Sequence, residues 1–171
     1  GYEEIQVKKK KKLAENYNSI TNKFILNNKA NFKKDLVEII YEKDTTYSPL
    51  ALYFILDNDI KTSNEEINEY FDILINDLGL EKEIKNLIIY KKALFNSDFE
   101  TENNLIEILK PLINSKSVWK SHALYLMAEY FLDKKQNQKA KEFFNKILNN
   151  ENSNESLIKE AKKRLSRDLS E

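Results

Sequence analysis

The 171-residue sequence contains no cysteine, one histidine, two glycines and two prolines. Without cysteine it has neither a disulfide framework nor thiolate chemistry. The single histidine, His122, excludes metal sites that require a histidine pair. Sandwiches, barrels and nucleotide-binding α/β folds need glycine at their turns, so two glycines argue against these classes. These absences favour a fold made of helices.

An excess of charge is also missing, since 28 Lys and Arg residues balance 28 Asp and Glu residues. Phosphate binding needs a basic excess, so we do not expect nucleic acid as the main partner. No run of about eighteen apolar residues occurs, so no part of this sequence is expected to span a membrane. Because Gly1 has no preceding methionine, we expect the natural chain to begin earlier, with room for a signal or membrane anchor.

Apolar residues at steps of three and four predict helices along the whole chain. The predicted helices span about residues 2–28, 30–42, 48–56, 63–78, 81–96, 101–114, 118–132, 138–151 and 154–169. Ser63 and Glu66 have the spacing of a capping box, and Gly79 is placed to end the same helix. Pro111 predicts a kink or an early end in its helix. The predicted fold class is all-α.

Residues 118–151 contain the best-formed repeat, two helices with apolar stripes joined by the polar turn Asp133–Asn137. Such a pair needs similar neighbours to bury both faces. We take four apolar positions of this pair and step back along the chain by 35, then 38, then 35 residues. Every position reached is apolar, although only 41% of the chain is hydrophobic. The sixteen positions are Ile20, Phe32, Leu36, Ile39, Ile55, Ile67, Phe71, Leu74, Ala93, Leu105, Leu109, Leu112, Ala128, Ala140, Phe144 and Ile147. We therefore predict one domain, residues 1–171, of four antiparallel helix pairs and a capping helix at 154–169.

The last pair resembles a tetratricopeptide repeat, with Ala128 at the small position of the first helix, Phe131 at an aromatic position, and Ala140 and Phe144 in the second helix. The resemblance implies a right-handed array whose concave face binds proteins or extended peptide segments. It also implies a set of partner-binding residues, and for each of them core packing is the alternative role. The set is Leu52, Leu56, Asp59, Tyr90, Leu94, Ser97, Tyr125, Glu129 and Leu132.

Four segments carry a narrower resemblance, to the tetratricopeptide-like domain of the bacterial ancillary Sec-translocon subunit family. They are Tyr47–Tyr53, Leu87–Leu94, Ala123–Tyr130 and Glu160–Leu165. The resemblance implies the periplasmic domain of a single-pass inner-membrane protein with an adaptor or chaperone-like role for exported proteins. Its partners would be translocon or envelope proteins, and its membrane segment would lie upstream of residue 1. A soluble cytoplasmic adaptor built on the same scaffold is the alternative.

Catalytic chemistry is not indicated. His122 is not accompanied by a nucleophile elbow, and Gly79 is the one internal glycine, so a phosphate-binding loop is not expected. We expect no enzyme activity, cofactor or metal. The five lysines Lys8–Lys12 fit a solvated helix end, or a patch that binds anionic lipid or RNA.

Overall fold

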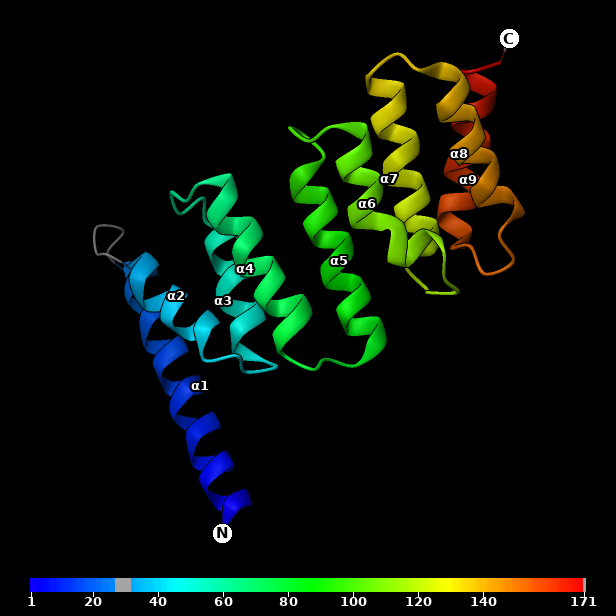
Figure 1. Ribbon diagram of the computed structural model, residues 1–171. Helices are drawn as coiled ribbons and strands as arrows, with labels where there is room; N and C mark the ends of the chain where they lie inside the picture. The colour runs from blue at the N-terminus through cyan, green and yellow to red at the C-terminus, as the bar shows by residue number, and fades with distance from the viewer. Residues whose placement is uncertain (27–31, 171) are drawn as a thin grey trace. The chain divides into compact units, whose positions relative to one another are not determined.

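The computed structural model describes residues 1–26 and 32–170, and this part of the chain contains nine α-helices and no β-strand (Figure 1). The all-α prediction is confirmed for these residues. The predicted end of the first helix and start of the second fall outside the described residues. The helices are α1 (Tyr2–Leu26), α2 (Phe32–Tyr41), α3 (Tyr47–Asp57), α4 (Asn64–Asp77), α5 (Lys82–Asn96), α6 (Glu102–Ile113), α7 (Lys120–Asp133), α8 (Asn137–Asn149) and α9 (Glu155–Arg167).

The chain divides into two compact units, Gly1–Leu80 and Glu81–Glu171. Each described helix packs against the next helix of its own unit. Helices two apart also touch: α1 contacts α3, α2 contacts α4, α5 contacts α7, and α7 contacts α9. The prediction that residues 1–171 form one domain stays a prediction.

All sixteen positions of the apolar repeat are buried. The most accessible of them, Phe32 and Ile20, are 7% and 6% exposed, and Phe71, Leu109 and Phe144 are completely buried. Removing apolar side chains from water is the main force that stabilises a fold. The repeated apolar positions therefore supply much of the core of both units.

The helix ends explain how the chain manages with so little glycine. Gly79 has a φ of 63° just beyond α4, as predicted, but Lys43, Asp59 and Lys135 adopt similar positive φ values after α2, α3 and α7. A side chain makes this left-handed conformation unfavourable, so these three turns carry a cost that glycine would avoid. At the start of α4, the predicted capping box forms between Ser63 and Glu66.

Two further predictions concern α6 and α7. Helix α6 runs through Pro111 and ends two residues later, at Ile113. A proline in the last turn removes only one hydrogen bond, which explains why the helix does not stop before it. Helix α7 begins at Lys120, slightly later than predicted, because Ser117–Trp119 form the turn that leads into it.

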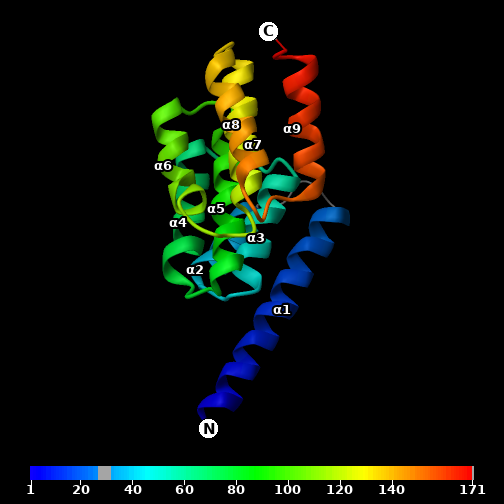
Figure 2. The same ribbon diagram turned by 90° about the vertical axis from the view of Figure 1, so that its right-hand side faces the viewer.

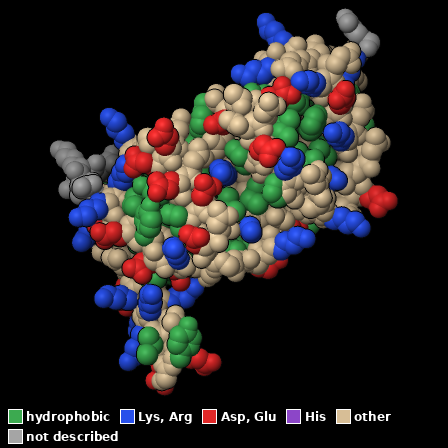
Figure 3. Space-filling model, viewed as in Figure 1, with side chains coloured by type: hydrophobic (Ala, Val, Ile, Leu, Met, Phe, Trp, Pro, Cys, Tyr) green, Lys and Arg blue, Asp and Glu red, His purple; other side chains and the backbone are tan. Residues whose placement is uncertain are grey.

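The N-terminal half of α1 extends beyond α2, α3 and α4 (Figures 1 and 2). Its apolar side chains Tyr2, Ile5 and Val7 are at least 64% exposed, and Figure 3 shows hydrophobic side chains at this end of the helix. Lys9 and Lys10 form ion pairs with Glu42 (3.9 Å) and Asp44 (3.4 Å), which tie α1 to the turn after α2. None of the described helices is both long and apolar enough to cross a membrane.

Candidate functional site

The second unit contains a hollow of about 550 Å³ at the C-terminal ends of α5 and α7. We call it the α5–α7 groove. It is lined by Leu94, Ser97, Asp98, Leu126, Glu129, Tyr130, Leu132, Asp133 and Arg164. Four of the predicted partner-binding residues, Leu94, Ser97, Glu129 and Leu132, therefore lie around one space.

The groove has an apolar interior and a polar rim. Leu126 and Tyr130 are 8% and 9% exposed, and the Tyr130 hydroxyl donates a hydrogen bond to the carbonyl of Glu100 at 2.9 Å. Leu94 is 42% exposed, although it belongs to a helix whose opposite face is in the core. An apolar side chain this accessible, next to buried apolar groups, is a natural contact for a partner.

Arg164 on α9 forms one wall of the groove. Its Nε donates to Asp168 at 2.9 Å, and its Nη1 donates to the Tyr125 hydroxyl at 3.1 Å and to the Glu129 carboxylate at 3.3 Å. Burial alone would lower the pKa of Arg164, but the hydrogen bonds to Asp168 and Glu129 raise it above its usual value. The Arg164 guanidinium thus links α9 to α7, and it donates its hydrogen bonds to neighbouring side chains of the protein itself.

Tyr125 is half-buried and contacts both Phe144 and Arg164. Its ring packs edge-on against Phe144, with centroids 5.8 Å apart, and its hydroxyl accepts the hydrogen bond from Arg164. Burial, and then the Glu129 carboxylate, raise the pKa of Tyr125. Its role is therefore partly structural, and Tyr125 offers less free surface to a partner than Leu94 does.

Tyr90, in the middle of α5, belongs to an aromatic cluster with Trp119 and His122 at the start of α7. Its ring stacks on that of Trp119, with centroids 5.9 Å apart. The centroid of the His122 ring lies 5.7 Å from that of Tyr90 and 4.9 Å from that of Trp119. Burial, and then the charge of Glu129, raise the pKa of Tyr90, which does not line the groove. The Nδ1 atom of His122 is buried and has no hydrogen-bond partner among the described residues, and burial lowers the pKa of this imidazole.

In the first unit, Leu52 is completely buried, so its predicted role in partner binding is wrong and it is a core residue. The cause is that α3 packs against α1, α2 and α4, which leaves little of this apolar helix in contact with solvent. Leu56 is half-buried, and Asp59 is exposed in the turn after α3.

Five groove residues were not predicted: Asp98, Leu126, Tyr130, Asp133 and Arg164. Asp98 and Asp133 directly follow the predicted residues Ser97 and Leu132, so both aspartates could have been predicted from their place in the sequence. Arg164 lies on the capping helix, for which the repeat pattern gives no groove position.

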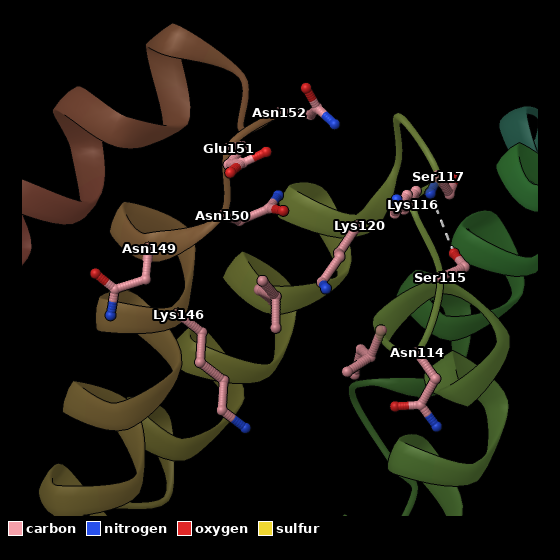
Figure 4. Close-up of a pocket in the computed structure, with 12 residues that line it drawn as sticks. Asn114, Ser115, Lys116, Ser117, Lys120, Lys146, Asn149, Asn150, Glu151 and Asn152 are labelled. Atoms are coloured by element: carbon pink, nitrogen blue, oxygen red, sulfur yellow. Dashed lines mark hydrogen bonds between the residues drawn. The ribbon is translucent and has the colours of Figure 1, made fainter.

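A second hollow, of about 640 Å³, lies at the opposite end of this unit, between the segment before α7 and the loop after α8 (Figure 4). Lys116, Lys120 and Lys146 line it together with Glu151 and several asparagines. In Figure 4, the side chains of Lys120 and Asn150 extend into the space between the two segments. Most of its polar residues are exposed, as expected for a solvated depression between loops.

Among the residues that the structure describes, no cluster of three or more histidine, aspartate or glutamate side chains is arranged to hold a metal ion. Comparisons of the chain with protein-family models, with curated proteins and with solved structures gave no match.

Proposed function

We propose that the chain is a non-enzymatic scaffold for protein–protein interaction, and that its α5–α7 groove binds an extended segment of a partner protein. The observation that carries this proposal is the exposed Leu94 beside the buried side chains of Leu126 and Tyr130, in a hollow large enough for several side chains. Apolar surface of this kind binds a partner because its burial removes it from water.

We further propose a tetratricopeptide-like right-handed array of four helix pairs, with α9 as the capping helix. The burial of all sixteen repeat positions supports this plan, because a shared register of core residues is what stacked helix pairs require. The packing of α5 on α7 and of α7 on α9 also supports it, since such arrays place alternate helices side by side on one face.

For location, we propose the periplasmic side of the inner membrane, with translocon or envelope proteins as partners. The support is the resemblance of the four sequence segments, among them Leu87–Leu94 and Ala123–Tyr130, which contribute groove residues. Protease treatment of spheroplasts that express the natural gene with a C-terminal tag tests this location. Loss of the tag supports it, and protection of the tag favours the cytoplasmic adaptor instead.

Binding of a permanently unfolded polypeptide, measured by fluorescence anisotropy, tests the groove. We expect the wild-type protein to bind and Leu94→Ser to bind more weakly. Ile84→Ser is a matched control, because Ile84 lies on the same helix, is 50% exposed and does not line the groove. Equal binding by wild type and Leu94→Ser would overturn the proposal.

A second candidate function rests on the lysine run. In the described part of the chain, Lys8, Lys11 and Lys12 are exposed and form no ion pair, whereas Lys9 and Lys10 pair with Glu42 and Asp44. Free lysines next to exposed apolar side chains suit an anionic lipid surface, with RNA as the alternative ligand. Sedimentation with anionic vesicles and binding to a homopolymer RNA, each at low and high salt, test this function. Replacement of Lys8, Lys11 and Lys12 by glutamine should abolish the binding.

A further inference from the structure

We infer that the segment bound in the α5–α7 groove carries basic side chains next to apolar ones. This inference rests on the proposed function and adds the chemistry of the partner. It follows from the distribution of charge around the groove and from the contacts that each charged group already makes.

Three carboxylates line the groove, those of Asp98, Glu129 and Asp133, against the single guanidinium of Arg164. Arg164 is already engaged by Glu129 and by Asp168, which lies outside the groove. Neither Asp98 nor Asp133 forms an ion pair or a side-chain hydrogen bond with any described residue. Lys134 lies over the ring of Tyr130, 5.5 Å from its centre, and is bonded to neither aspartate. Two exposed negative charges at the rim are therefore left without a partner.

The two aspartates lie close in sequence to the apolar side chains of the groove. Asp98 comes four residues after the exposed Leu94, and Asp133 directly follows Leu132. A partner that buries an apolar side chain against Leu94 must bring its neighbouring residues to this acidic rim. Glutamate or aspartate there would be repelled, whereas lysine or arginine would be attracted.

The expected electrostatic preference is modest, because both aspartates are exposed to water. An exposed ion pair contributes little on its own, so two such pairs correspond to a change in affinity of between about twofold and thirtyfold. Salt screens exposed charges over a distance of about 10 Å at 0.1 M. The preference for a basic segment should therefore decrease as salt is added, while the apolar contribution remains.

Three fluorescent peptides of equal length, with leucine at alternate positions and lysine, glutamine or glutamate between them, test the inference by anisotropy. The wild-type protein should bind the lysine peptide more tightly than the glutamine peptide, and the glutamate peptide most weakly. In the double variant Asp98→Asn with Asp133→Asn, the affinity for the lysine peptide should fall by about twofold to thirtyfold, and the affinity for the glutamine peptide should not change.

The matched control is Glu142→Gln with Glu151→Gln, which removes the same charge from two exposed residues outside the groove. This control should keep the order of the three peptides, and circular dichroism should show that both double variants remain folded. If all three peptides bind equally, the charge preference is overturned while the proposed function stands. If none binds, both are overturned. A wild-type dimer that the Asp98→Asn, Asp133→Asn variant dissociates would make a second copy of the chain the occupant and also overturn the inference.

Discussion

The Glu83 carboxylate on α5 accepts a hydrogen bond from the backbone N–H of Val118 at 2.7 Å, across 35 residues of sequence. Its other oxygen accepts from the Ser117 hydroxyl at 2.8 Å and from Asn86 at 2.6 Å. These bonds, that of Val118 first, hold the pKa of Glu83 below its usual 4.5. One side chain thus fixes the segment that leads into α7, and with it the position of α7 beside α5.

Glu83→Ala should lower the free energy of unfolding at pH 7, because it leaves the Val118 N–H and the buried Ser117 hydroxyl without this acceptor. Urea unfolding of wild type and variant measures the loss. Glu142→Ala is the control, since Glu142 is exposed on α8 and should be nearly neutral. An equal effect of the two substitutions would show that the Glu83 bonds do not stabilise the fold.

The Glu83 contribution should also depend on pH. Because its pKa is lower in the folded protein than in the unfolded chain, its stabilisation is complete above pH 4.5 and is lost as the pH falls through the folded pKa. The difference in stability between wild type and Glu83→Ala should therefore shrink when unfolding is measured in increasingly acidic buffer. A difference that stays constant would contradict this assignment.

His122 should also make the stability of the protein depend on pH, in a range of higher pH than that of the Glu83 contribution. Burial lowers its pKa below 6.5, so the unfolded chain takes up the proton first and the free energy of unfolding falls as the pH drops below 6.5. Trp119 is the single tryptophan and contacts His122, so its fluorescence reports unfolding at each pH. In His122→Asn, the change in stability between about pH 7.5 and 5.5 should be smaller than in wild type.

Phe144→Ala should cost about 3–5 kcal/mol of stability, the usual range for truncation of a buried aromatic side chain. Phe144 is completely buried and contacts the ring of Tyr125. Phe143→Ala provides the comparison, because Phe143 is half-buried and its loss should be smaller. Urea unfolding that gives Phe143 the larger cost would show that the assigned core position is wrong.

Lys135→Gly should raise the free energy of unfolding by up to about 1 kcal/mol. Lys135 has a φ of 61° after α7, where glycine avoids the cost of a side chain. The backbone bonds of this turn, Lys135 N to Leu132 O and Gln136 N to Phe131 O, do not involve the side chain and should persist. Lys134→Gly is the control, because Lys134 has an ordinary φ of −81° and gains nothing from glycine.

The helices and the core could be predicted from the sequence because both depend on a local pattern. Apolar residues at three- and four-residue steps are buried whichever helix covers them, so positions such as Leu36, Phe71 and Leu109 were found without a structure. The start of α4 was equally predictable, since Ser63 and Glu66 make their capping bonds within four residues of chain.

The partner-binding residues required the tertiary structure. Leu56 and Leu94 occupy equivalent predicted positions, yet Leu56 is half-buried and Leu94 is 42% exposed. Their sequence neighbourhoods do not distinguish them, because exposure depends on which other helices cover each face. Three helices pack on α3, whereas Leu94 borders an open hollow at the end of α5.

The charge of the groove was likewise decided by contacts between distant residues. The sequence determined that Asp98, Glu129, Asp133 and Arg164 carry charge. It did not determine that Arg164 lies against Glu129, 35 residues away, while the two aspartates form no ion pair with any residue that the structure describes. A helical pattern specifies which residues share a face of one helix. Only the packing of α9 on α7 brings the guanidinium to Glu129 and leaves the rim of the groove negative, because the strength of an electrostatic interaction depends on distance in space and not along the chain.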